Sequence, residues 1–135
     1  MENNKFTDPY EIAKFIKEAK KTTPIKLYIN GDIEKINWDK CKVFKGHNSA
    51  VVFGELIDIE EILNRYKESI EEYELEFDRR NSAISLLDTN KVQARIEPGA
   101  IIRGRVSIGK GAVIMMGAVI NIGAEVGEGS MVDMN

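Results

Sequence analysis

A six-residue repeat in the last third of the chain constrains its fold more than any other feature of the sequence. Every sixth residue there is a β-branched aliphatic: Ile96, Ile102, Ile108, Ile114, Ile120, Val126 and Val132. Three positions after each aliphatic comes a column of mostly turn-forming residues: Gly99, Arg105, Gly111, Gly117, Gly123, Gly129 and Asn135. Two positions before each comes a column of mostly small residues: Ala94, Ala100, Val106, Ala112, Ala118, Ala124 and Ser130. An inward-facing aliphatic and a tight turn therefore recur together along this whole segment.

This period predicts short strands separated by tight corners. A helix would repeat about every 3.6 residues, a coiled coil about every 3.5 and a half-buried strand about every 2. Three six-residue units close one triangular coil, in which each aliphatic stacks on its equivalent one coil above. No single coil buries its apolar face alone, so stability comes from stacking. Residues 94–135 are therefore expected to form a little over two coils of a parallel β-helix, and Gly109-Lys110-Gly111 belongs to this repeat rather than to a phosphate-binding loop.

The preceding residues have a different composition and are predicted to form a separate α/β domain. Residues 1–90 contain every aromatic residue of the chain, whereas residues 94–135 contain none and hold eight of the eleven glycines. This change places a domain boundary near residue 90. We expect an α/β domain at 1–90 and the start of the β-helix at 91–135.

Local signals predict the elements of this α/β domain. Asp8-Pro9 is typical of a helix start, because aspartate caps the first turn and proline suits the first helical position. Alternating apolar residues predict a strand at 25–29, and two shorter strands are expected at 43–44 and 50–53. A longer amphipathic helix is expected to begin at a capping Asp58. Its apolar stripe has spacings of three and four and consists of Ile59, Ile62, Leu63, Tyr66, Ile70, Tyr73 and Phe77.

Composition and charge exclude several classes of function. The formal net charge is −3 and the basic residues form no cluster, so neither nucleic acid nor an anionic membrane is an expected partner. No apolar run approaches the roughly 18–20 residues that cross a bilayer, and the first residues lack a signal-peptide pattern, so a cytoplasmic protein is expected. The single cysteine, Cys41, fits a reducing compartment and is interpreted as a small buried residue rather than a nucleophile. The only histidine, His47, lies outside the repeat, so no metal site is expected.

Four runs of sequence closely resemble those of one known protein family. Three of them, RIEPGAIIR at 95–103, AVIMMGAVINIGA at 112–124 and VGEGSMVDMN at 126–135, lie in the repeat. The fourth, DRRNSAI at 78–84, resembles the join between that family's N-terminal domain and its β-helix. The chain thus resembles the tetrahydrodipicolinate N-acetyltransferases, a family of hexapeptide-repeat acyltransferases, and the resemblance covers nearly the whole chain. Ser85 departs from it, because the family pattern has proline at that position.

The resemblance implies a fold, a reaction and an assembly. The coils of this family wind left-handed. Acetyl-CoA, a co-substrate rather than a permanently bound cofactor, donates its acetyl group to the amine of ring-opened tetrahydrodipicolinate, a dicarboxylate of the diaminopimelate and lysine pathway. The family is expected to form homotrimers, with active sites between adjacent β-helices.

Amide formation from a thioester needs an unprotonated amine and a group that takes its proton. Asp133 directly follows the inward-facing Val132, so its carboxylate should face outward from the coil. Related N-succinyltransferases carry a functional aspartate in a context that resembles Met131-Val132-Asp133, which implies a catalytic role for Asp133. Asn121 and Asn135 are candidate substrate contacts. The arginines of the first coil are interpreted as structural or interfacial, and they are Arg95, Arg103 and Arg105.

The position of Asn135 raises two further alternatives. The family continues through more coils, so we expect this chain to be an incomplete piece of a longer enzyme, inactive alone because its acetyl-CoA site would be incomplete. A natural small protein whose last coil is buried in an oligomer is the other interpretation. Beside the acyltransferase, a non-enzymatic module that uses the β-helix for trimerisation or scaffolding remains the alternative function.

Overall fold

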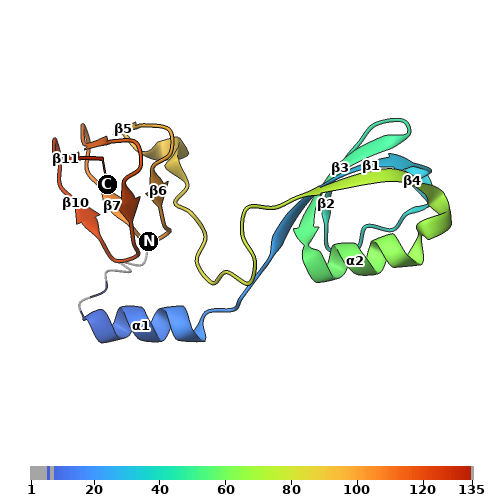
Figure 1. Cartoon of the computed structure of the whole chain (residues 1–135), viewed down its shortest axis with the longest axis horizontal. Helices are drawn as coiled ribbons and strands as arrows, with labels where there is room; N and C mark the ends of the chain where they lie inside the picture. Colours follow the sequence, from blue (N-terminus) through green and yellow to red (C-terminus); the bar gives the residue numbers. More distant parts are fainter. Residues whose placement is uncertain (1–5, 7, 135) are drawn as a thin grey trace. The chain divides into compact units, whose positions relative to one another are not determined.

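The computed structural model describes residue 6 and residues 8–134, so the candidate Asn135 lies outside the described residues. The chain divides into two compact units, coloured along the sequence in Figure 1. One unit, here called the sheet unit, consists of residues 21–82. The other, the coil unit, combines the N-terminal segment up to Lys20 with the residues from Ala83 onward. This division differs from the boundary predicted near residue 90, because the first helix is grouped with the coils.

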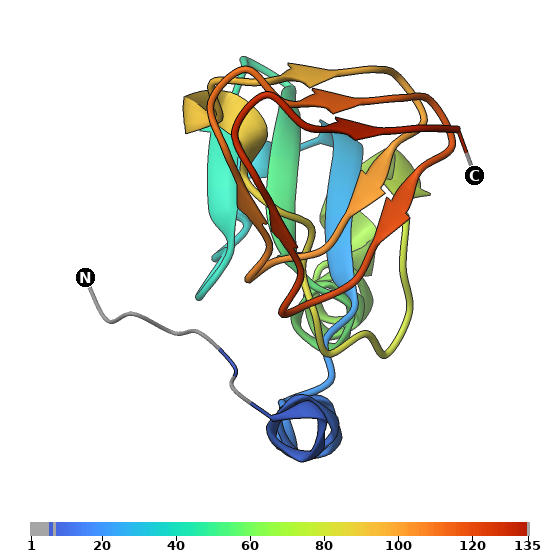
Figure 2. The same cartoon turned by 90° about the vertical axis from the view of Figure 1, so that its left-hand side faces the viewer.

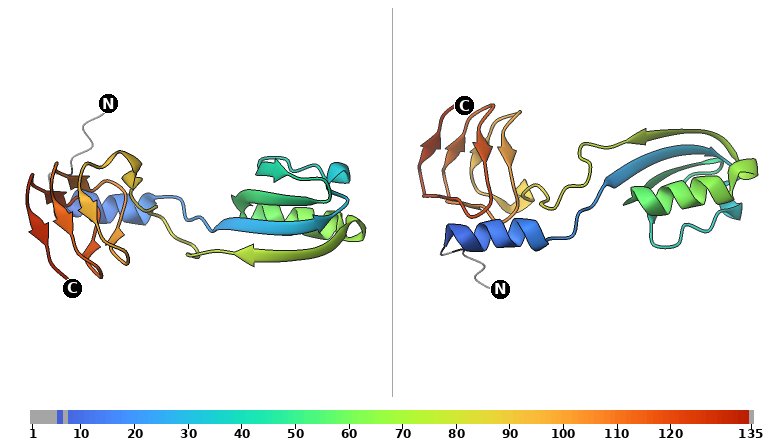
Figure 3. Two further views of the ribbon diagram at one scale, coloured as in Figure 1. Left: turned by 90° about the horizontal axis from the view of Figure 1, so that it is seen from above. Right: turned by 60° about the horizontal axis from the view of Figure 1, so that its bottom comes forward.

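The sheet unit contains one antiparallel sheet with a helix on one face. Its strands are β1 (Pro24–Gly31), β2 (Lys42–Lys45), β3 (Ser49–Glu55) and β4 (Ile70–Glu76), in the spatial order β2-β3-β1-β4. Helix α2 (Leu56–Arg65) lies against one face of this sheet (Figure 3). Two 3-10 turns, Ile33–Lys35 and Lys67–Ser69, complete the unit. The three predicted strands are confirmed as β1, β2 and β3.

Alternation along the strands builds the core of this unit. Ile25, Leu27 and Ile29 of β1 are buried, whereas the residues between them face the other side of the sheet. Val52 of β3 is also buried, and Ile59 of α2 packs into the same cluster. Since neighbouring strand residues point to opposite faces, all these side chains lie on the face that α2 covers.

The predicted long helix is wrong in its second half. Helix α2 ends at Arg65, and the residues that were expected to continue the stripe form strand β4. Tyr73, Leu75 and Phe77 also alternate at a spacing of two, and Leu75, which lies outside the helical stripe, packs against the core. Pairing with the free edge of β1 selects the strand, because ladder hydrogen bonds satisfy both backbones.

The predicted cap of this helix is also wrong. Helix α2 begins at Leu56, so Asp58 lies inside its first turn. The residue at the cap position is Glu55, whose side chain does not cap the helix. Its carboxylate instead accepts a hydrogen bond from the backbone N–H of Thr23, at 2.9 Å.

The repeat of the coil unit folds as predicted, with one two-residue strand for each six-residue unit. The strands are β5 (Arg95–Ile96), β6 (Ile101–Ile102), β7 (Ser107–Ile108), β8 (Val113–Ile114), β9 (Val119–Ile120), β10 (Glu125–Val126) and β11 (Met131–Val132). Each ends on a residue of the aliphatic column. The pairs are parallel and join residues three repeats apart: β5-β8-β11, β6-β9 and β7-β10. Figure 2 shows the successive coils stacked on one another.

The aliphatic and turn columns have the predicted structural roles. Ile114 is fully buried and pairs with Ile96 on one side and Val132 on the other, so the aliphatics stack between coils. Every described residue of the turn column has a positive φ, from 63° to 84°. Arg105 is the one non-glycine among them. The small column is needed because its side chains also point into the narrow interior, where Ala112 has no exposed surface.

Helix α1 (Pro9–Glu18) belongs to the coil unit and lies along the coils in Figure 3. Its predicted start is confirmed, since Asp8 caps it by accepting a hydrogen bond from the Tyr10 N–H at 2.8 Å. Ile12 contacts the corner at Gly123, where an added Cβ would lie 2.7 Å from its Cδ1. In the part of the chain that the structure describes, no helix is long and apolar enough to cross a membrane.

Candidate functional site

Asp133 lies at an outer corner of the last described coil. It directly follows β11, and its side chain is exposed, whereas the preceding Val132 packs toward the coil interior. Its Oδ1 accepts a hydrogen bond from the Met134 N–H at 2.7 Å. The same corner carries Glu97 and Met115 in the two preceding coils, because β5, β8 and β11 stack in one sheet. The predicted outward orientation of Asp133 is therefore confirmed, and its catalytic role stays a prediction.

Asn121 lies at a different corner and has an arginine partner. It follows β9, while Arg103 occupies the equivalent position after β6, one coil earlier. The Nη1 of Arg103 donates a hydrogen bond to Oδ1 of Asn121, at 3.3 Å. This pair presents a cation and a carboxamide together on the surface. The spacing of three repeats between the two residues was the signal that could have paired them.

The structure does not bring Asp133 and Asn121 together within one chain. Strands β9 and β11, which precede them, belong to different sheets of the coil. Arg95, which precedes the Asp133 corner by two coils, instead pairs with Glu97, its Nε lying 3.3 Å from the carboxylate. A site that uses both corners would need residues from more than one copy of the coil.

Arg105 contacts aromatic rings rather than solvent alone. Its guanidinium carbon lies 4.7 Å from the ring centroid of Phe6 and 4.1 Å from that of Phe15. The two rings are themselves 5.5 Å apart. These cation–π contacts attach α1 to the coil corner, which agrees with the structural role predicted for this arginine.

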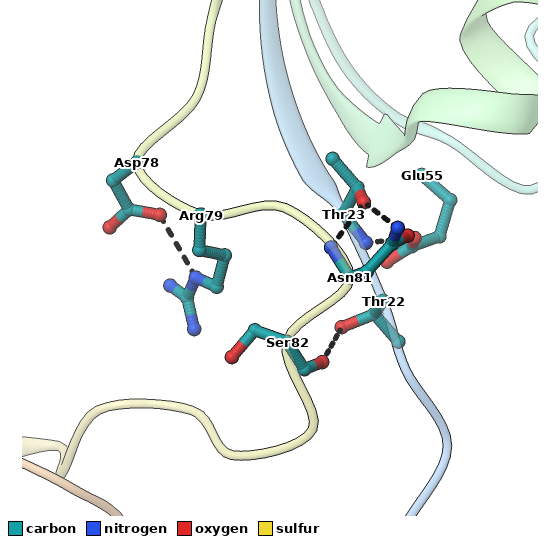
Figure 4. A network of polar contacts seen from close by, with 7 residues as sticks. All are labelled: Thr22, Thr23, Glu55, Asp78, Arg79, Asn81 and Ser82. Atoms are coloured by element: carbon teal, nitrogen blue, oxygen red, sulfur yellow. Dashed lines mark hydrogen bonds and ion pairs between the residues drawn. The ribbon is translucent and has the colours of Figure 1, made fainter.

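A polar network closes the base of the sheet unit, as Figure 4 shows. Thr22 and Ser82 exchange two backbone hydrogen bonds, at 2.8 and 2.9 Å. The Asn81 N–H donates to Oγ1 of the buried Thr23 at 3.0 Å, and Thr23 also donates its own N–H to Glu55. This network holds together the two segments that enter and leave the sheet. Asn81 and Ser82 of this network belong to the run DRRNSAI that resembles the join of the family.

Cys41 has the environment of a packing residue. It is half-buried and packs against the core of the sheet unit, where an added Cβ on Gly54 would lie 2.5 Å from its Sγ. Burial raises the pKa of the Cys41 thiol, and the nearby carboxylates of Asp58 and Asp39 raise that pKa further. A thiol with a raised pKa is a poor nucleophile at neutral pH.

The described residues contain no group of three His, Cys, Asp or Glu side chains that could hold a metal ion. His47 lies exposed in the sheet unit, on the turn between β2 and β3. The prediction that the protein uses no metal is not tested by this observation and stays a prediction.

Comparison with known proteins identifies the family. A sequence profile described as "Tetrahydrodipicolinate succinyltransferase N-terminal" matches residues 7–89. A protein of Thermoanaerobacter pseudethanolicus is 59% identical over 114 residues, which are 84% of this chain and 47% of the relative. Relatives from Bacillus velezensis and Clostridium perfringens are 54% and 57% identical, over 84% and 80% of this chain and 48% and 46% of their own length.

All three relatives are named 2,3,4,5-tetrahydropyridine-2,6-dicarboxylate N-acetyltransferase. The chain spans about half the length of these curated relatives. The family profile covers the whole sheet unit and helix α1. The alignment with the Thermoanaerobacter protein spans 114 residues, which is more than the 93 residues that precede the repeat, so this alignment also includes part of the coils. The chain therefore belongs to the tetrahydrodipicolinate acyltransferase family defined by this N-terminal domain.

Proposed function

We propose that the protein transfers the acetyl group of acetyl-CoA to the amine of ring-opened tetrahydrodipicolinate, in the diaminopimelate and lysine pathway. The observation that carries this proposal is the identity of 54–59% to relatives named for that N-acetyl transfer. Acetyl-CoA is a co-substrate here, and no resident cofactor is proposed. Because acetyl-CoA is supplied inside the cell, we expect the protein to work in the cytoplasm.

In the proposed reaction, the neutral amine attacks the thioester carbonyl, an amide bond forms, and the CoA thiolate leaves. A carboxylate beside the amine orients it, accepts the proton that the nitrogen loses as the amide forms, and returns that proton to the leaving thiolate. We assign this role to Asp133. Its support is the exposed position at a coil corner, where the carboxylate accepts a hydrogen bond from the adjacent Met134 N–H.

We propose that three copies of a left-handed coil form the active sites between them. Two observations support this arrangement. The outward side chains of Ile101 and Val119, paired neighbours on β6 and β9, are 49% and 70% exposed, so this side of the coil offers apolar surface to a neighbour. Asp133 and the Arg103–Asn121 pair lie at different corners, so a neighbouring copy could complement one corner with the other. The arginine would then hold a carboxylate of the substrate.

A chimeric protein tests this function whatever the natural length of the chain. In it, this chain replaces the matching part of the Thermoanaerobacter relative, and CoA release is followed with tetrahydrodipicolinate as acceptor. The chimera is expected to release CoA from acetyl-CoA at a rate above background. A folded, trimeric chimera that releases no CoA above background would refute the proposed function.

The role of Asp133 is tested in the same chimera. Asp133→Asn should lower kcat by on the order of 10²–10⁴, the usual contribution of a general base, with little change in KM. Glu97→Gln is the matched control, since Glu97 occupies the same corner two coils earlier and loses the same charge. Near-normal turnover of Asp133→Asn would overturn the assignment, as would an equal loss in Glu97→Gln.

A further inference from the structure

The face of the sheet that α2 leaves uncovered carries large apolar side chains. Tyr28 of β1, Phe44 of β2 and Phe53 of β3 alternate with the buried core residues, so they point to this second face. Their exposed fractions are 37%, 53% and 42%. Rings of this size rarely stay in water as a contiguous group without a partner surface.

Charged residues flank these rings on two opposite edges of the same face. The strand registers align Glu76, Lys26, Phe53 and Lys42 in one row across the sheet. They align Glu74, Tyr28, Val51 and Phe44 in the next row. Glu72 continues the acidic edge on β4. We call this set of nine residues the open sheet face.

The side chains of the open sheet face already contact one another. The ammonium of Lys26 lies 5.3 Å from the ring centroid of Tyr28 and 6.0 Å from that of Phe53. The ammonium of Lys42 lies 5.2 Å from the Phe44 ring, and the Phe44 and Phe53 rings meet edge to face at 6.1 Å. These contacts orient the aromatic side chains in advance, so docking a partner orders few further groups.

The charge pattern indicates what the partner is. β4 brings three carboxylates to one edge, whereas β2 at the other edge brings Lys42 and Phe44, and Phe53 and Tyr28 lie on the two strands between these edges. A two-fold axis parallel to the strands would place β4 of one copy over β2 of the other. Lys42 would then face Glu76 of the second copy twice, while Lys26 would face the Phe53 ring and Tyr28 would face Val51 in the centre.

Other occupants fit the open sheet face less well. A two-fold axis perpendicular to the strands would place carboxylates of β4 against carboxylates of β4. A nucleic acid strand would gain the two lysines and the rings, but its phosphates would meet the three glutamates. We propose that the open sheet face packs against the same face of a second copy of this chain, with Lys42 opposite Glu76. This contact is independent of the proposed acetyl transfer and of any association through the coils.

Charge reversal tests the pairing. Sedimentation velocity is run on the chain carrying Lys42→Glu, Glu76→Lys, or both, beside the unchanged chain. Each single reversal should weaken this association at least about tenfold, because each pair occurs twice in a two-fold interface. Combining the two reversals should restore it. All four proteins share the same coils, so any association through the coils cancels in the comparison.

Matched controls and a second measurement keep the result interpretable. Glu60→Lys and Lys67→Glu make the same charge changes at exposed residues outside the open sheet face, and should leave the association of the chains unchanged. Carbodiimide cross-linking of mixed ¹⁴N and ¹⁵N chains should join Lys42 of one copy to Glu76 of another.

Three outcomes would overturn the proposal. The first is an association between copies that neither single reversal weakens. The second is a double reversal that stays as dissociated as the single ones. The third is a sheet unit that never self-associates but binds a single-stranded oligonucleotide through Phe44 and Phe53.

Discussion

Replacement of Arg105 sets two opposing effects of known size against each other. This residue occupies the turn column with a φ of 63°, where the other described members are glycines. A left-handed conformation costs a residue with a side chain about 1 kcal/mol relative to glycine. Glycine at this position would therefore relieve strain, while removing the guanidinium that contacts Phe6 and Phe15.

The contacts are worth more than the strain. Each cation–π contact of a half-buried arginine contributes about 1 kcal/mol, so the two rings together contribute about 2 kcal/mol. Arg105→Gly should lower the free energy of unfolding of the coil unit by about 1 kcal/mol, since it loses about 2 kcal/mol of ring contacts and relieves about 1 kcal/mol of strain. Arg105→Ala loses the same contacts and keeps the strain, so it should lower the free energy of unfolding of the coil unit by about 2 kcal/mol.

Amide hydrogen exchange of the slowest-exchanging residues of the coil unit measures this free energy, because these amides open only when the unit unfolds. Exchange should be about 5-fold faster in the glycine variant and about 30-fold faster in the alanine variant than in the unchanged chain. Arg95→Ala is the control, since Arg95 lies in the same coil but pairs with Glu97 and contacts Met115. Slower exchange in the glycine variant than in the unchanged chain would show that strain outweighs the ring contacts and would refute this reasoning.

Two further predictions concern the cores of the two units. Ile114→Ala should destabilise the coil unit by about 2–5 kcal/mol and Ile114→Val by about 0.5–1.5 kcal/mol, because this side chain is fully buried between Ile96 and Val132. Urea unfolding followed by circular dichroism measures both losses of stability. Equal losses in the two variants would contradict the stacking. Alkylation of Cys41 by iodoacetamide should reach half its maximal rate at a higher pH than a free cysteine, because a raised pKa lowers the thiolate fraction at any given pH. Asp58→Asn should shift that midpoint back toward lower pH, and an unchanged or higher midpoint would contradict the electrostatic contribution of this carboxylate.

The coil was predictable because a six-residue period has few physical solutions. Each strand from β5 to β11 ends on a residue of the aliphatic column, and the turn column takes the left-handed backbone that its glycines allow. Position within the repeat also predicted that Asp133 faces outward. These predictions depend only on residues close together in the sequence, so they need no knowledge of distant contacts.

The segment after Arg65 was not predictable from its own pattern. Ile70, Tyr73 and Phe77 satisfy helical spacing, and Tyr73, Leu75 and Phe77 satisfy strand spacing. Only the free edge of β1, a feature of the folded sheet, decides between them. Tertiary pairing therefore overrides the helical pattern here.

Contacts between distant segments were missed for a related reason. The sequence contains no signal that α1 attaches to Arg105 through Phe6 and Phe15, because the two segments lie about ninety positions apart. The Arg103–Asn121 hydrogen bond could have been predicted, since residues three repeats apart lie side by side in successive coils. Arg103 was interpreted as structural or interfacial, and no partner was predicted for it.

The most direct test of the proposed function is to identify which acyl group is transferred, because the family profile is described by succinyl transfer and the relatives are named for acetyl transfer. The chimera is given tetrahydrodipicolinate with acetyl-CoA and succinyl-CoA together at equal concentration, and the products are identified by mass spectrometry. We predict that the N-acetyl product dominates, and that Asp133→Asn abolishes most of it. A product that is mainly N-succinyl, or no acylated product from a folded trimer, would contradict the proposed acetyl transfer.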